Sequence, residues 1–80
     1  MSNTFSAVKH ILRSKLLIPV RRIRSRQLLT SEIGLSAFEL NTLLYFIEEK
    51  YRVDLHTLQP SATLQELVDS IDNNLNSKIV

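Results

Sequence analysis

The 80-residue chain contains no cysteine, no tryptophan and only one glycine. Without cysteine it has no disulfide framework, no thiolate nucleophile and no cysteine-based metal site. One glycine and two prolines leave long stretches without the residues that break helices. No alternation of apolar and polar residues, the pattern of a half-buried strand, extends for any length. The sequence therefore predicts a small all-helical domain, and its lack of cysteine fits a reducing compartment.

Long hydrophobic runs are also lacking. The longest is Leu16-Leu17-Ile18-Pro19-Val20, which a proline punctuates and which falls far short of a membrane span of about 20 residues. The N-terminal stretch has neither the continuous apolar region nor the small-residue cleavage site of a signal peptide. We expect a cytoplasmic, monomeric protein with no membrane span. Its 44% hydrophobic content predicts one folded domain over residues 1–80.

Acidic residues are missing from the first 26 positions of the chain. Residues 1–26 carry seven basic side chains and no acidic one, a net charge of +7. Residues 27–80 carry all eight acidic side chains against three basic ones, a net charge of −5. We expect one end of the fold to be cationic, which affects the choice of partner and the rate of encounter.

The first predicted helix extends from about Thr4 to Leu17. Its apolar residues recur at helical spacing: Phe5, Val8, Ile11, Leu12 and Leu16. Thr4 and Ser2 are candidate N-caps. Pro19 ends the helix, because the residue before a proline is disfavoured in helical geometry. A long connection over residues 19–35 follows, with Val20, Ile23, Leu28 and Leu29 as apolar anchors. A loop of this length in a small domain is often functional.

The chain is organised around the stretch from Ile33 to Leu40. Ser36 is a good N-cap residue and Glu39 follows three positions later, which predicts a capping box. Gly34 allows a sharp turn just before the cap. The predicted helix runs from Ala37 to about Tyr51. Its apolar stripe comprises Leu40, Leu43, Leu44, Ile47 and Tyr51.

Two further helices are predicted after this one. Thr57-Leu58-Gln59 forms a short helix before Pro60, and Thr63 with Glu66 forms a second capping box that opens the last helix. The apolar residues on one face of this last helix are Leu64, Leu67, Val68, Ile71 and Leu75. We expect the helical core to cover residues 4–72, with the polar tail frayed. The predicted fold is a small four-helix bundle of three longer helices and one short helix, with a long loop between the first two.

In this order the pieces resemble the acyl carrier protein family, over roughly Phe5 to Ile71. The family has a first helix, a long loop, and a Gly-x-Asp-Ser-Leu motif at the start of its second helix. Here that position reads Gly34-Leu35-Ser36-Ala37-Phe38. The helix ends in Ile47-Glu48-Glu49-Lys50-Tyr51, similar to the family's acidic-aromatic stretch. Thr63-Leu64-Gln65-Glu66-Leu67-Val68 resembles the start of the family's last helix.

The resemblance implies a carrier that holds acyl intermediates as thioesters on a 4′-phosphopantetheine arm, for fatty-acid, polyketide or related biosynthesis. The family attaches the arm to the motif serine, whose position is occupied here by Ala37. Attachment needs a hydroxyl oxygen as nucleophile, and alanine has none. No phosphopantetheine is therefore expected on the chain as written.

Three explanations of Ala37 remain open at this stage. In the first explanation, the natural chain has serine at position 37 and this one carries a Ser→Ala replacement. Alternatively, the chain is a natural degenerate carrier, an interaction protein without a prosthetic group. In the third explanation Ser36 is modified instead, although its side chain is expected to cap the helix.

The resemblance also implies partners: a phosphopantetheinyl transferase, an acyl-activating or acyltransferase enzyme, and a condensing enzyme. We expect them to meet the long loop and the outer face of the second helix. The candidate contact residues on the helix are Phe38, Glu39, Glu48 and Glu49, and those on the loop are Arg21, Arg22, Arg24 and Arg26. Phe38 is either a bundle residue or an exposed contact, and the glutamates alone are also typical of a solvated helix face.

Other function classes have less support. The run from Arg21 to Arg26 makes a basic helical module for nucleic acid an alternative, but no aromatic residue is interleaved for base stacking. Such a run is more often a solvated face. His10 and His56 are isolated in the sequence, which predicts no metal site. We expect a non-catalytic carrier or interaction domain, not an enzyme. Whether an acyl chain shelters between the helices is not decided by the sequence.

Overall fold

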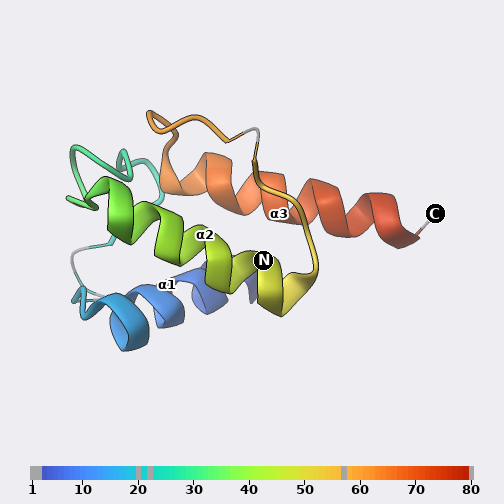
Figure 1. Ribbon diagram of the computed structural model, residues 1–80, viewed down its shortest axis with the longest axis horizontal. Helices are drawn as coiled ribbons and strands as arrows, with labels where there is room; N and C mark the ends of the chain where they lie inside the picture. The colour runs from blue at the N-terminus through green and yellow to red at the C-terminus, as the bar shows by residue number, and fades with distance from the viewer. Residues whose placement is uncertain (1–2, 20, 22, 57, 80) are drawn as a thin grey trace.

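The computed structural model describes residues 3–19, 21, 23–56 and 58–79, and over these residues the chain forms three helices and no strand. These are α1 (Asn3–Leu16), α2 (Ala37–Tyr51) and α3 (Leu64–Ile79). Helix α1 packs against both α2 and α3 (Figure 1). The predicted all-helical class is confirmed.

Thr4, one of the two caps predicted for α1, does not cap the helix. Thr4 lies inside the helix and is buried, and its Oγ1 donates a hydrogen bond to Asp72 Oδ1 of α3 at 2.6 Å. The prediction of Thr4 as an N-cap is therefore wrong, because its hydroxyl joins two helices instead of closing one. Ser2, the other candidate, lies outside the described residues.

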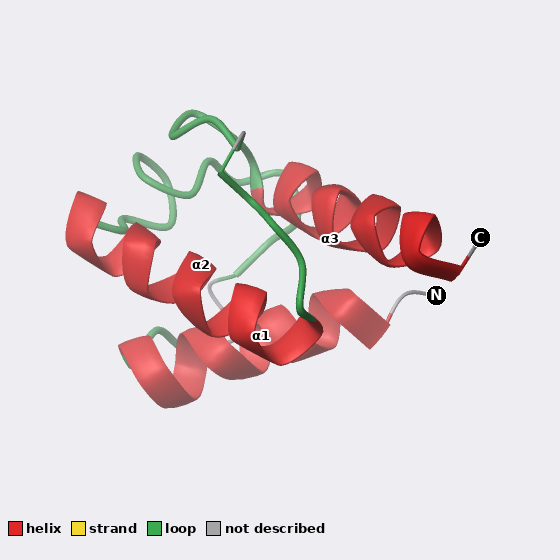
Figure 2. Ribbon diagram, turned by 45° about the vertical axis from the view of Figure 1, so that its right-hand side comes forward, coloured by secondary structure: helices red, strands yellow, loops and turns green. Residues whose placement is uncertain are grey.

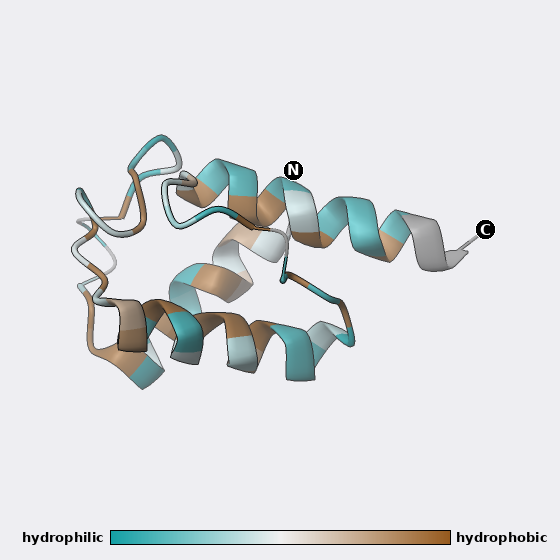
Figure 3. Ribbon diagram, turned by 45° about the horizontal axis from the view of Figure 1, so that its top comes forward, coloured by the Kyte–Doolittle hydropathy of each residue, from teal (hydrophilic) through white to brown (hydrophobic). Residues whose placement is uncertain are grey.

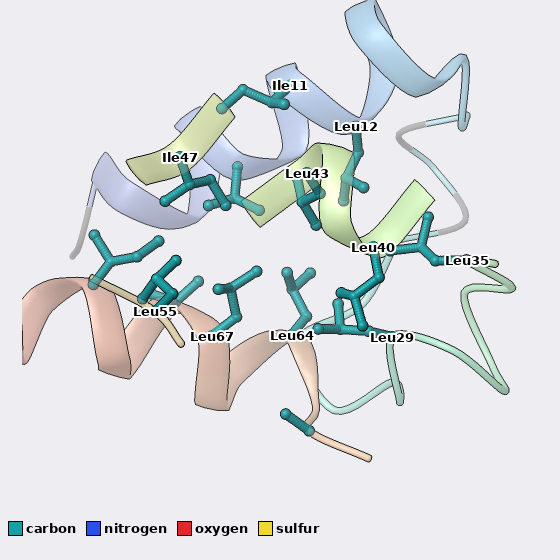
Figure 4. Close-up of a cluster of buried hydrophobic side chains, with 14 of the residues drawn as sticks. Ile11, Leu12, Leu29, Leu35, Leu40, Leu43, Ile47, Leu55, Leu64 and Leu67 are labelled. Carbon is teal, nitrogen blue, oxygen red and sulfur yellow. The ribbon is translucent and has the colours of Figure 1, made fainter. Parts of the chain in front are cut away.

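The hydrophobic core draws on all three helices and on the loops between them. Figure 4 shows α2 side chains such as Leu43 and Ile47 turned toward Leu67 of α3. Each helix buries the stripe that its spacing predicts, with Phe5, Leu16, Leu44, Tyr51 and Leu75 only half-buried at the edges. The buried residues are Val8, Ile11, Leu12, Ile23, Leu29, Leu35, Leu40, Leu43, Ile47, Val53, Leu55, Ala62, Leu64, Leu67, Val68 and Ile71.

Helix α2 is apolar on more than one side, as Figure 3 shows by hydropathy. Its half-buried Phe46 lies toward α1, with Lys15 Nζ 5.4 Å from the ring centroid. Tyr51 at its C-terminal end has a pKa raised above the usual 10.0, first by burial and then by the negative charge of Asp72. Arg52 closes the helix in the left-handed conformation (φ 57°), and its N–H donates to the Glu48 carbonyl.

The predicted short helix before Pro60 is not found. Thr57 lies outside the described residues, and Leu58 and Gln59 are not helical. Two separate turns occupy this segment instead: Leu58 N–H donates to the Leu55 carbonyl, and Ala62 N–H donates to the Gln59 carbonyl. Because Pro60 has no N–H to donate, no helical hydrogen bond joins the two turns through it.

Helix α3 opens with the predicted capping box and is longer than expected. Glu66 N–H donates to Thr63 Oγ1 at 3.1 Å, and Thr63 N–H donates to Glu66 Oε1 at 3.0 Å. The sequence predicted fraying beyond residue 72, whereas the helix continues to Ile79. Half-buried Leu75 packs against the core and so extends the order of the helix past the polar Asn73-Asn74 pair.

The long loop is tied by backbone hydrogen bonds to the start of α3. Leu29 N–H donates to the Ala62 carbonyl at 3.1 Å, while Gln27 and Ser25 carbonyls accept from Leu64 and Gln65 at 2.9 and 2.8 Å. The two acceptors satisfy N–H groups in the first turn of α3 that have no partner within the helix. Figure 2 shows the loop, the start of α2 and the start of α3 at one end of the molecule.

Candidate functional site at the start of α2

The chain enters α2 through a fixed turn. Gly34 has φ +91°, a conformation that residues with a side chain rarely adopt. Leu35, which follows, is buried, and its N–H donates to the Leu29 carbonyl at 3.0 Å. One residue therefore turns the chain and the next anchors it, which fixes where the helix begins.

Ser36 caps the helix as predicted. Its Oγ accepts a hydrogen bond from Glu39 N–H at 3.1 Å, and Ser36 N–H donates to Glu39 Oε1 at 3.0 Å. The reciprocal bonds satisfy two backbone donors and hold the Ser36 side chain against the helix end. The hydroxyl that the sequence offered as an alternative attachment point thus has a structural role in the cap.

Ala37 and Phe38 are presented to solvent. Ala37 is exposed in the first turn of α2, and Phe38 keeps 78% of its surface exposed. Phe38 is therefore a surface residue and not part of the bundle interior. Ala37 projects only a methyl group, so the residues present do not fit covalent attachment of phosphopantetheine at the position where the carrier family has its serine.

The acidic residues of α2 have different surroundings. Glu39 serves in the capping box, and Glu48 Oε2 accepts a hydrogen bond from Leu55 N–H at 2.9 Å, which ties the following segment to the helix. Glu49 is exposed. Of the three predicted acidic contacts, two carboxylates thus already accept backbone hydrogen bonds. Tyr45, 58% exposed, lies two helical turns from Phe38 and adds a second aromatic residue to this surface.

The predicted basic contacts lie on the loop that precedes the site. Arg21, Arg24 and Arg26 are exposed, and Arg22 lies outside the described residues. Arg24 N–H donates to Gln27 Oε1 at 2.8 Å, so this part of the loop has a local backbone anchor. A pocket of about 460 Å³ lies beside Arg21 and Arg24, between the loop and the end of α1.

A second pocket, of about 290 Å³, lies between α2 and the segment that follows it. Four leucines contribute apolar surface to it, and Glu48 and His56 contribute polar surface. The leucines are Leu40, Leu44, Leu55 and Leu58. The pocket opens beside the core and not within it, since Leu43 and Ile47 are fully buried in the packed interior.

The interpretation of His56 as isolated is wrong, because Asp54 lies beside it. Its Nδ1 lies 2.6 Å from Asp54 Oδ1, which also accepts the His56 N–H at 3.0 Å. These hydrogen bonds, the side-chain one first, lower the pKa of Asp54 below its usual 3.8. The signal was available, since an aspartate often accepts the N–H two residues later. No group of three or more potential ligands for a metal occurs among the described residues.

No helix in the described part of the chain is long and apolar enough to cross a membrane. Comparison with protein-family models and with curated proteins gives no match to the chain. The resemblance to acyl carrier proteins therefore depends on the order and spacing of residues in the sequence.

Leu17 and Ile33 also lie at this end of the molecule, lining the pocket near Arg21, and the sequence did not single them out as site residues. Leu17 belongs to the longest apolar run, which was assessed only as too short for a membrane span. Its left-handed backbone conformation depends on how the chain leaves α1, and a hydrophobic pattern does not predict that.

Proposed function

We propose that the chain is an acyl-carrier-type domain in which the start of α2 is the presentation site and position 37 decides whether the domain can be loaded. The observation that carries this proposal is the geometry of residues 34–38: a turn at Gly34, a buried anchor at Leu35, a cap at Ser36, and two exposed residues. A group placed at position 37 would project from a rigid helix start into solvent.

The surrounding surface supports the same assignment. Exposed Phe38 and Tyr45 offer apolar contacts to an enzyme that reaches position 37, and the exposed arginines of the loop offer charge. In the form with serine at position 37, the partners are a phosphopantetheinyl transferase, an acyl-activating or acyltransferase enzyme, and a condensing enzyme. The apolar lining of the 290 Å³ pocket beside α2 is suited to the first carbons of an acyl chain.

The chain as written, with Ala37, acts in this proposal as a carrier-like interaction domain without an arm. It retains the exposed aromatic surface and loses only the nucleophilic oxygen. Restoring serine adds one hydroxyl at an exposed position in the first helical turn, so we expect the fold to be unchanged. The proposal is therefore testable by a gain of function.

The test compares the chain with its Ala37→Ser variant after incubation with coenzyme A and a broad-specificity phosphopantetheinyl transferase, read by intact mass. We expect the variant to gain one phosphopantetheinyl group and the unaltered chain to gain none. A double variant, Ser36→Ala with Ala37→Ser, identifies the modified residue and is expected to gain the group as well.

Two results would overturn the proposal. A folded Ala37→Ser variant that no transferase modifies would remove the support for a carrier. A mass gain on the unaltered chain that Ser36→Ala abolishes would place attachment at Ser36 and contradict the role given to position 37. Circular dichroism of each variant establishes that the helices are retained.

Nucleic-acid binding is the proposed alternative from another class, and the exposed arginines of the loop are its only support. A nucleic-acid module would bind random duplex DNA with an affinity that falls steeply with salt. We expect no such binding, because the arginines lie on an irregular loop without aromatic neighbours suited to base stacking.

A further inference from the structure

The pocket at the end of α1 has an apolar wall and a wall that carries two arginines. It has a volume of about 460 Å³, within the range of small-molecule sites. Its apolar wall consists of Leu17, Ile18, Pro19 and Ile33, and its polar wall consists of Arg21, Arg24, Gln27 and Glu32. The end of α1 and both ends of the long loop are brought together here, at the left of Figure 1.

Among the described residues, no carboxylate lies within 4.0 Å of the guanidinium group of Arg21 or Arg24. Glu32 lies in the pocket wall, but its Oε1 accepts the Leu28 N–H at 2.9 Å and so closes a turn of the loop. Both guanidinium groups are therefore available for a carboxylate or phosphate group, which arginine can bind through two parallel hydrogen bonds.

Leu17 adds exposed apolar surface to this pocket. It adopts φ +58°, a left-handed conformation that is costly for leucine, while 83% of its surface remains exposed. The Ile18 N–H donates to the Leu12 carbonyl at 3.0 Å and closes the helix end around it. Glycine would fit this position with less strain. The left-handed conformation is common just past the end of a helix and recurs at Arg52, so only the exposed side chain, whose apolar surface a molecule in the pocket can cover, points to a ligand.

We propose that this pocket binds an amphiphilic anion, a molecule in which a carboxylate or phosphate group is joined to a short aliphatic chain. The headgroup pairs with Arg21 and Arg24, and the aliphatic chain covers Leu17 and Ile33. A purely apolar ligand would leave the guanidinium groups without partners, and a free inorganic anion would leave Leu17 exposed. The site is separate from position 37, so it stands or fails independently of the carrier assignment.

The test titrates the full chain with octyl phosphate and with octanoate below their micellar concentrations, followed by amide chemical shifts in NMR spectra. Inorganic phosphate and octanol serve as the two halves of the ligand, and octylammonium serves as the charge control. We expect shifts centred on residues 17, 18, 21, 24 and 33. The better of the two octyl anions should bind at least about tenfold more tightly than either half, and octylammonium should not bind.

The two octyl anions distinguish a carboxylate ligand from a phosphate ligand, because the natural headgroup gives the tighter complex. Arg21→Gln combined with Arg24→Gln should weaken binding about tenfold or more, through the loss of charge-assisted hydrogen bonds. Arg26→Gln is the matched control: Arg26 is exposed on the same loop but does not line the pocket, so binding should be retained.

Leu17→Gly separates the ligand role of the leucine from a purely structural one. It relieves the strained backbone and removes the apolar contact, so we expect a higher melting temperature together with several-fold weaker binding. Arg52→Gly relieves the same kind of strain at the end of α2 and should raise the melting temperature without changing binding. Unchanged affinity in both Leu17→Gly and the double arginine variant, or shifts centred on the pocket beside α2, would overturn the proposal.

Discussion

Helices α2 and α3 start with the same capping motif, but the first residue after it is exposed in α2 and buried in α3. Both open with a capping box, Ser36 with Glu39 and Thr63 with Glu66, at nearly equal hydrogen-bond distances. At α3 the first helical residue, Leu64, is fully buried and its N–H donates to the loop. At α2 the first helical residue, Ala37, is exposed.

The difference shows that the cap itself carries no functional information. A capping box fixes where a helix begins, and the residue that follows decides whether that point belongs to the core or to the surface. At α3 the start is an anchor for the long loop. At α2 it is a rigid platform with two exposed residues, which is the property that the proposed function uses.

Truncating an apolar side chain in the first turn of each helix should give the largest contrast. Leu64→Ala removes a fully buried leucine and should lower the free energy of unfolding by about 3 kcal/mol. Phe38→Ala removes an exposed ring and should change it by less than about 0.5 kcal/mol. Urea denaturation of both variants measures the contrast, and equal losses would mean that Phe38 is packed.

The second largest contrast in stability is expected between substitutions in the turns that precede α2 and α3. Gly34→Ala forces a side chain into φ +91°, although no atom lies within 4 Å of the added Cβ, so the cost is backbone strain of about 1–2 kcal/mol. Ser61→Ala, an exposed change in the turn before α3, is the control and should be close to neutral. Chemical denaturation tests this, and a neutral Gly34→Ala would contradict a fixed entry into α2.

Removing the caps should have a smaller effect that is similar at both starts. Ser36→Ala and Thr63→Ala should each cost about 1 kcal/mol of stability, because each leaves a backbone donor unsatisfied. Glu39→Gln preserves a side-chain acceptor for Ser36 N–H and should cost less than Glu39→Ala. Thermal unfolding of the four variants measures these losses of stability. A loss at only one of the two caps would contradict the prediction that the caps contribute similarly.

The smallest expected effect concerns pH, in the segment between α2 and α3. Hydrogen bonds from His56 lower the pKa of Asp54 in the folded chain, so Asp54 contributes stability above its unfolded pKa of about 3.8. That contribution is lost as the pH falls from about 3.8 through the lower folded value. Asp54→Asn should therefore flatten the acid limb of stability against pH, measured by urea denaturation at several pH values. An unchanged acid limb would mean that the contact with His56 does not persist in solution.

The sequence predicted the three longer helices and the two capping boxes, because these depend on local spacing and on one pair of side chains each. Leu43, Leu64 and Ile71 were assigned to the core from periodicity alone, and the structure buries them. The tie between the loop and α3 was not predicted, because backbone hydrogen bonds such as Leu29 to Ala62 depend on tertiary contact.

The candidate site was predicted only in part for the same reason. Ser36, Ala37 and the exposed arginines of the loop could be named from order and spacing. The exposure of Phe38 and the strain of Leu17 could not, since a hydrophobic side chain at a helix end fits either the core or the surface. The prediction of a short helix before Pro60 was wrong because a local pattern of three residues does not exclude separate turns.

The most direct measurement places a new serine at each helix start and asks which one is modified. Ala37→Ser and Gln65→Ser both add a hydroxyl at an exposed position in the first turn, one in α2 and one in α3. After incubation with coenzyme A and the transferase, intact mass should show one phosphopantetheinyl group on Ala37→Ser and none on Gln65→Ser. Modification of neither variant, or of both equally, would contradict the claim that the start of α2 is a carrier presentation site.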